Sequence, residues 1–141
     1  MILVIDNFIK DKNLLQEIAN DSKFFSDPGV YYWWDGWWNE EAKTTKQRLI
    51  DAIWADNCPL SKPMSIRGFE YWTGIQTANT ETGFSNNLGG HYDKDEELFA
   101  KTGEIVTPSM GTVYYPEQPE FEGGMLEIYT EGVDKTPEVV Y

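Results

Sequence analysis

Residues 88–97, LGGHYDKDEE, contain the only histidine of this 141-residue chain. His91 stands two positions before Asp93, and side chains two apart on an extended strand point to the same side. An imidazole and a carboxylate on one face supply two of the three ligands of a 2-His-1-carboxylate metal site. Gly89 and Gly90 allow a close backbone approach just before them. The stretch therefore predicts a metal-binding pair, although a strand histidine beside an aspartate also occurs as a structural contact.

The residue pattern changes from helical to β along the chain. In residues 1–62, which are predicted to be mostly helical, ILVID (2–6) suits a buried strand, and helices are expected behind Asp11 and behind Thr44 or Thr45. In residues 63–141, strands are expected in the aromatic and branched segments 64–76, 107–116 and 125–131, with 116–124 as a hairpin connection. The length suits one domain, so we predict a single α+β domain over residues 1–141.

Three motifs occur in a recognisable order: GGHYDKDEE (89–97), VTPSMGTVYYP (106–116) and FEGGMLEIY (121–129). Together they resemble the core of the prolyl-4-hydroxylase-like branch of the Fe(II)/2-oxoglutarate-dependent oxygenases. The N-terminal VIDNFIKDKNLLQEI (4–18) is similar to the strand and helix that begin this family, so the resemblance covers nearly the whole chain. It implies a double-stranded β-helix, a cupin-like jelly roll, with N-terminal helices packed on the sheet.

The resemblance also implies a site. His91 and Asp93 match the family's first two iron ligands and would be the catalytic residues. Tyr115 stands where the family often has a tyrosine that touches 2-oxoglutarate, and Tyr114 is the neighbouring candidate. The alternation of a strand lets only one of these two tyrosines face the cavity. Further residues expected to line the same cavity are Tyr71 and Gln76.

The implied activity is that of a dioxygenase that hydroxylates a C–H bond. Its cofactors would be Fe(II) and 2-oxoglutarate, with ascorbate as a candidate reductant and with succinate and CO₂ as co-products. The substrate would be a peptide, such as one with a prolyl side chain, or a small molecule.

The chain departs from the family's pattern near its C-terminal end. The second iron-binding histidine and the basic residue that pairs with 2-oxoglutarate belong beyond Gly124, where 17 residues follow (141 − 124) without a histidine. We therefore expect a truncated jelly roll that lacks its last strands, and a homodimer that covers the incomplete sheet. Three interpretations remain open: a piece of a longer oxygenase, a carboxylate such as Glu127 in place of the histidine, or a fold without the chemistry.

Charge limits the partners. Eleven basic residues stand against 24 acidic ones, for a formal net charge of −13, and the basic residues form no cluster. This disfavours nucleic acid and anionic membrane surfaces, which attract basic clusters. The opening MILVIDNFIK lacks the basic start of a signal peptide, and no apolar run approaches the roughly 20 residues of a membrane span. With Cys58 as the single cysteine, we expect a soluble cytoplasmic protein.

Two further patterns suggest other functions. DKDEELFAKTGE (93–104) places acidic residues at several positions of a calcium-binding EF-hand loop, but Leu98 stands where the turn requires glycine. The simpler interpretation is a solvated acidic stretch that runs into a short helix. YYWWDGWWNEE (31–41) carries four tryptophans, which form either a packed cluster or a stacking platform for a sugar or aromatic substrate. The platform predicts a non-catalytic jelly-roll module that binds sugar or peptide and has no affinity for Fe(II).

Overall fold

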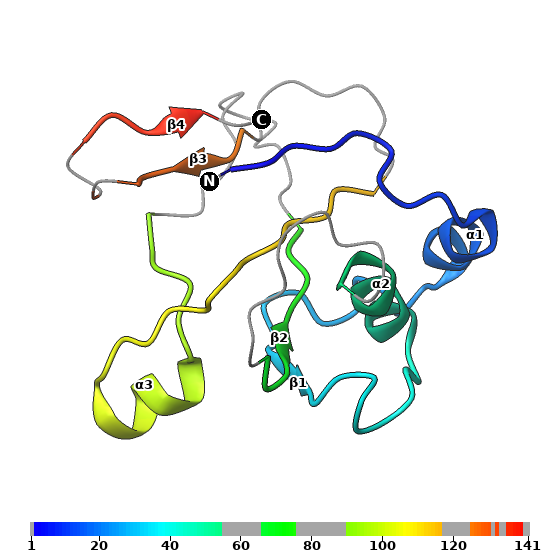
Figure 1. The fold of residues 1–141 in the computed structure, drawn as a ribbon, viewed down its shortest axis with the longest axis horizontal. Coiled ribbons are helices and arrows are strands. Elements are labelled where there is room, and N and C mark those ends of the chain that lie inside the picture. The colour runs from blue at the N-terminus through cyan, green and yellow to red at the C-terminus, as the bar shows by residue number, and fades with distance from the viewer. Residues whose placement is uncertain are drawn as a thin grey trace. The chain divides into compact units, whose positions relative to one another are not determined.

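The structure is a computed structural model that describes residues 2–54, 66–75, 90–116, 125–130, 132 and 135–139, without the side chain of Val139. By its internal contacts the chain divides into two compact units, residues 1–75 and 76–141. The described ranges form an α+β structure with two separate two-stranded antiparallel sheets (Figure 1). The elements in chain order are α1 Lys12–Asn20, β1 Tyr32–Trp34, α2 Thr45–Trp54, β2 Phe69–Tyr71, α3 Glu96–Thr102, β3 Glu127–Ile128 and β4 Glu138–Val139.

Helix α1 begins where the sequence supplies an acceptor for its free backbone N–H groups. The Asp11 carboxylate accepts hydrogen bonds from the N–H groups of Asn13 at 2.8 Å and Leu14 at 3.3 Å. This confirms the predicted N-cap. Leu14 and Ile18 lie four positions apart and are buried, whereas the neighbouring Leu15 is exposed. The helix thus presents a narrow apolar stripe to the first unit.

Helix α2 begins with a reciprocal pair of hydrogen bonds that identifies Thr44 as its cap. The Thr44 hydroxyl accepts from the N–H of Gln47 at 3.2 Å, and the Gln47 side-chain oxygen accepts from the N–H groups of Thr44 at 3.2 Å and Lys43 at 2.8 Å. This is a capping box with glutamine at its third helical position. Further along α2, Leu49 and Trp54 are buried.

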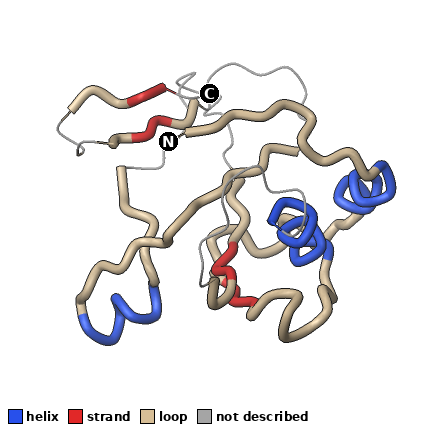
Figure 2. Tube along the Cα trace, viewed as in Figure 1, coloured by secondary structure: helices blue, strands red, loops and turns tan. Residues whose placement is uncertain are grey.

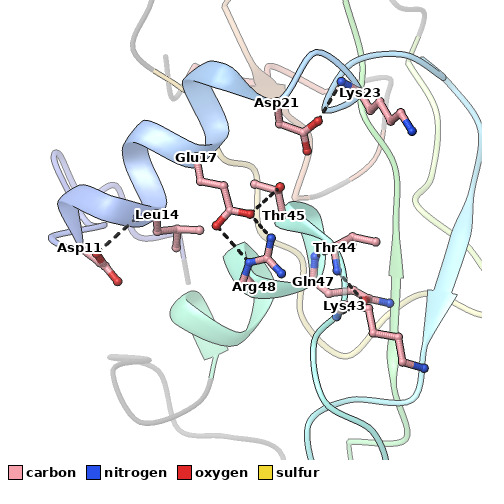
Figure 3. A network of polar contacts seen from close by, with 10 residues as sticks. All are labelled: Asp11, Leu14, Glu17, Asp21, Lys23, Lys43, Thr44, Thr45, Gln47 and Arg48. Atoms are coloured by element: carbon pink, nitrogen blue, oxygen red, sulfur yellow. Dashed lines mark hydrogen bonds and ion pairs between the residues drawn. The ribbon is translucent and has the colours of Figure 1, made fainter.

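A polar contact joins α1 to α2. The Glu17 carboxylate accepts hydrogen bonds from the Thr45 hydroxyl at 3.0 Å and from Nε of Arg48 at 3.1 Å, and it also contacts a terminal guanidinium nitrogen (Figure 3). Both charged side chains are more than a third exposed, so the ion pair contributes at most about 1 kcal/mol to stability. Its main effect is to fix how the two helices lie against each other.

Strands β1 and β2 form an antiparallel ribbon with an aromatic core on one face. Trp34 stands opposite Phe69 in the register and is fully buried. The Phe69 ring lies at the centre of this core, because its centroid is 5.7 to 6.0 Å from the rings of four tryptophans. These are Trp34, Trp37, Trp38 and Trp54. The packed-cluster interpretation is therefore confirmed for Trp34, while Trp33 and Trp38 remain exposed.

The second unit contains α3 and a small hairpin. The Asp95 carboxylate caps α3 by accepting from the N–H of Leu98 at 2.8 Å, and Gly103 ends the helix with a φ of 73°. This positive φ favours glycine. Strands β3 and β4 pair antiparallel, with Ile128 opposite Glu138. The burial of residues 125–128 alternates, with Leu126 and Ile128 the less exposed, as predicted for a half-buried strand.

Two of the predicted strands are wrong in the described part of the chain. Residues 2–5 and residues 107–116 form no strand, and both segments are drawn as loop in Figure 2. The apolar side chains of Leu3, Val4 and Ile5 are exposed. A strand needs hydrogen bonds from a neighbour, and within the described ranges neither segment pairs with one. The hydrophobic pattern alone was therefore not sufficient to predict these two strands.

The double-stranded β-helix and the single-domain organisation remain predictions. The described strands pair only as two short ribbons, so the double-stranded β-helix is not assembled from them. The single-domain assignment likewise stays a prediction, and most of the hairpin connection expected at 116–124 lies outside the described residues. Among the helices of the described ranges, none has the length and apolar character needed to cross a membrane.

Candidate metal-binding site

His91 and Asp93 approach each other in the extended segment before α3. The distance from Nε2 of His91 to Oδ1 of Asp93 is 3.5 Å, and the two side chains are 50% and 49% exposed. Both side chains therefore point to the same side of the chain, as their spacing predicts. About half of the surface of each side chain is open to solvent.

One backbone hydrogen bond holds the loop next to Asp93, and a second segment of backbone lies beside its carboxylate. The N–H of Asp95 donates to the carbonyl of Val106 at 2.9 Å, which closes the loop that contains α3. We call residues 103–116, which follow α3, the returning segment. A Cβ built on Gly111 in this segment would lie 4.0 Å from Oδ2 of Asp93. The returning segment therefore runs beside the His91–Asp93 pair. A side chain at position 111 would come into contact with the Asp93 carboxylate.

The acidic residues after Asp93 belong to the start of α3. Asp95 is the cap, Glu96 pairs with Lys94 at 2.7 Å, and Glu97 contacts Lys101 one turn further along. Carboxylates in a first helical turn are favoured by the helix dipole. Because α3 begins at Glu96, it occupies the middle of the proposed EF-hand loop, which excludes that alternative. The solvated acidic stretch running into a short helix is confirmed.

The two candidate tyrosines of the returning segment differ in exposure. Tyr114 is half-buried, and desolvation raises the pKa of its phenol, whereas Tyr115 is exposed. The prediction that strand alternation turns only one of them toward a cavity loses its basis, because residues 107–116 form no strand. Burial favours Tyr114 over Tyr115 as the more enclosed phenol, and the contact of either with 2-oxoglutarate stays a prediction.

Tyr71 belongs to the first unit. Its ring stacks on that of Tyr32 with centroids 5.7 Å apart. Burial is the main cause that raises the pKa of Tyr71. Since His91 lies in the second unit, a cavity shared with Tyr71 stays a prediction, and Gln76 lies outside the described residues.

A third protein ligand is missing from the described part of the chain. In the described ranges, no three His, Cys, Asp or Glu side chains come together as a metal site. Glu127, the carboxylate considered as a replacement for the histidine, instead accepts a hydrogen bond from the Tyr129 hydroxyl at 3.0 Å. The structure thus brings together two metal donors and does not add Glu127 to them.

One group of residues was not predicted from the sequence as a unit. Tyr31 and Trp72 stand next to the β1–β2 pairs with ring centroids 5.1 Å apart, so they bring two distant sequence segments together. The high aromatic content of residues 31–34 and 69–72 is visible in the sequence. Whether these aromatic residues come together depends on the pairing of β1 with β2, and the alternation of side chains within each segment does not predict that pairing.

Comparison of the chain with protein-family models, with curated proteins and with solved structures finds no match. The resemblance to the 2-oxoglutarate oxygenases therefore depends on the order of the sequence motifs alone.

Proposed function

We propose that this chain supplies His91 and Asp93 as metal ligands of an Fe(II)- and 2-oxoglutarate-dependent oxygenase centre. The observation that supports the proposal is the 3.5 Å approach of Nε2 of His91 to Oδ1 of Asp93 on an exposed segment. Imidazole and carboxylate are the ligand types of the facial iron site, which leaves positions for a co-substrate and O₂. The motif order in residues 89–129 agrees with this assignment.

The spacing of the two donors fits one ion closely. Two donors bound at about 2.1 Å and at right angles to one ion lie roughly 3.0 Å apart. The observed separation of 3.5 Å is slightly larger, and half-exposed side chains rotate readily to close such a difference. Two of the three protein ligands are therefore supplied, and the third position would be filled by solvent or by a residue from elsewhere.

Each of the two residues has a definite task in this proposal. His91 must be neutral so that Nε2 offers its lone pair, and Asp93 must be ionised so that it partly neutralises the cation. When bound, Fe(II) would activate O₂, with 2-oxoglutarate as the reducing co-substrate: one oxygen atom would enter the substrate C–H bond and the other the succinate that forms as CO₂ is released. A peptide, including a prolyl residue, and a small molecule remain the proposed substrates.

The test is an anaerobic titration of the chain with Fe(II) and 2-oxoglutarate, followed through the charge-transfer absorbance of the chelate. We expect a saturable signal in the wild type that is lost in His91→Ala and weakened in Asp93→Asn. Glu97→Gln is the matched control, because it removes an exposed carboxylate of the same region without touching the pair. Equal signals in His91→Ala and the wild type, or none in either, would overturn the assignment.

A non-catalytic binding module is the second candidate function. The observation that favours it is the exposure of Trp33 in the first unit, where an indole ring of 57% exposure faces solvent. Large exposed aromatic side chains commonly mark binding surfaces. This candidate predicts ligand binding without Fe(II).

A further inference from the structure

The β1–β2 ribbon has a second face, opposite the aromatic core. Trp33 stands opposite Glu70 in the register, and alternation places Tyr31 and Trp72 on the same side. All three aromatic side chains are exposed, Tyr31 by 45%, Trp33 by 57% and Trp72 by 39%. We call Tyr31, Trp33 and Trp72 the aromatic face. Three large exposed rings on so short a ribbon form an apolar patch of the kind that marks a binding surface.

The Trp33 ring is held in a fixed orientation. A Cβ built on Gly68 would lie 2.3 Å from Cζ2 of Trp33, so the indole rests directly on the backbone of this glycine. At its edge, Nε1 donates a hydrogen bond to Oδ1 of Asp35 at 2.7 Å. One side of the ring is thus occupied by backbone and the indole N–H is anchored. A ring fixed before binding loses little conformational entropy when a ligand stacks on its free side.

The charges around this ring favour a cation. The exposed Asp35 carboxylate lies at the edge of the indole. A tryptophan ring attracts cations through its quadrupole, and the adjacent carboxylate adds to that attraction. The whole chain carries a formal charge of −13, which draws in basic partners over longer distances. A neutral sugar would gain from stacking but not from these charges.

The protein already makes contacts of this kind within itself. The Lys46 ammonium lies 5.3 Å from the centroid of the Tyr32 ring, and the Lys94 ammonium lies 4.7 Å from that of Phe99. Both distances fall within the usual range for cation–π attraction. Tyr32 belongs to the opposite face of the same ribbon, where a lysine of α2 supplies the cation.

We propose that the aromatic face binds a basic peptide segment, with an arginine or lysine side chain stacked on Trp33 beside Asp35. The inference gives the binding-module candidate a ligand class, and it does not depend on the metal pair, which lies in the other unit. Metal binding and peptide binding are therefore separable: each is tested with its own ligand and reduced by its own substitution.

The test is a titration of the ¹⁵N-labelled protein with the capped peptide Gly-Arg-Gly-Arg-Gly-Arg-Gly, followed through the indole N–H signal of Trp33. The control peptide carries citrulline at each arginine position and therefore keeps the shape without the charge. Cellohexaose serves as the neutral sugar. We expect the arginine peptide to shift the Trp33 signal saturably, to bind more weakly as salt is added, and to bind more tightly than the other two ligands.

Substitutions complete the design, with binding followed by calorimetry. Trp33→Ala removes an exposed ring and is expected to weaken binding roughly 3- to 30-fold. Asp35→Asn keeps an acceptor for the indole N–H while removing the charge, so it should weaken binding by a smaller factor. Phe99→Ala, which removes an exposed ring of the other unit, should leave binding unchanged. Equal binding of the citrulline peptide, preference for cellohexaose, or no shift with any ligand would each overturn the proposal.

Discussion

The rings of Trp34 and Phe69 face each other across the β1–β2 ribbon with their centroids 5.8 Å apart, and Phe69 also contacts the rings of Trp37, Trp38 and Trp54. Phe69 itself is half-buried, so loss of its ring would remove packing from the fully buried Trp34 and leave only part of a closed cavity. Phe69→Ala is therefore expected to lower the free energy of unfolding by about 2 kcal/mol, measured by urea denaturation. The matched variant Phe99→Ala removes an exposed ring and should lower it by less than about 1 kcal/mol. Similar losses in both variants would contradict this description of the core.

The capping box of α2 makes a second prediction. Thr44→Ala removes the acceptor for the N–H of Gln47 and should lower the free energy of unfolding by about 1 kcal/mol. Thr44→Ser keeps the hydroxyl and should change it little, which separates the cap from other effects of the substitution. If the serine variant lost as much stability as the alanine variant, the hydroxyl would not be the stabilising group.

The Thr73 hydroxyl is buried, and in the described part of the chain it has no hydrogen-bond partner. Burial of an unpaired hydroxyl is unfavourable, and valine has nearly the same shape. Thr73→Val is therefore expected to raise the free energy of unfolding by about 1 kcal/mol. In contrast, the Thr102 hydroxyl donates to the carbonyl of Leu98 at 2.9 Å, so Thr102→Val should give no such gain. A loss of stability in Thr73→Val would show that its hydroxyl is bonded.

The pKa of Asp21 is lowered from its ordinary value of 3.8, first by the polar side chain of Thr45 nearby and then by the N–H of Lys23, which donates a hydrogen bond to its carboxylate at 2.9 Å. A lowered folded-state pKa stabilises the fold above the unfolded-state pKa, and this stabilisation is lost as the pH falls through the folded-state value. Wild type should therefore be more stable than Asp21→Asn at pH 6, with the difference shrinking below about pH 4. Urea unfolding at pH 3 to 6 measures this. A difference that stays constant across that range would exclude the proposed linkage.

The elements that the sequence predicted well are those set by neighbouring residues. Asp11 and Thr44 each cap a helix through hydrogen bonds to residues two or three positions away. Asp95 caps α3 in the same way, although only a short helix and no cap was predicted there. Such contacts need no knowledge of the rest of the fold, so the helix starts could be located from the sequence.

The strands depend on distant partners, and this is where prediction from the sequence fell short. Residues 2–5 have an apolar pattern suited to a strand but no pairing in the described ranges, whereas β1 lies in the part predicted to be mostly helical. For the site, the approach of His91 to Asp93 follows from a two-residue spacing. A third ligand would depend on tertiary contacts, and spacing along the chain says nothing about those.

The most direct test of the metal proposal uses the fact that His91 is the only histidine. In protein labelled with ¹⁵N-histidine, the imidazole nitrogens of one residue are observed without overlap. Because Nε2 faces Asp93, we predict that Zn(II), as a diamagnetic substitute for Fe(II), shifts the Nε2 signal at near-stoichiometric concentration. Asp93→Asn should require a several-fold higher concentration, and anaerobic Fe(II) should broaden the same signals. Binding through Nδ1, or spectra unchanged by either metal, would contradict the assignment of His91 and Asp93 as a metal pair.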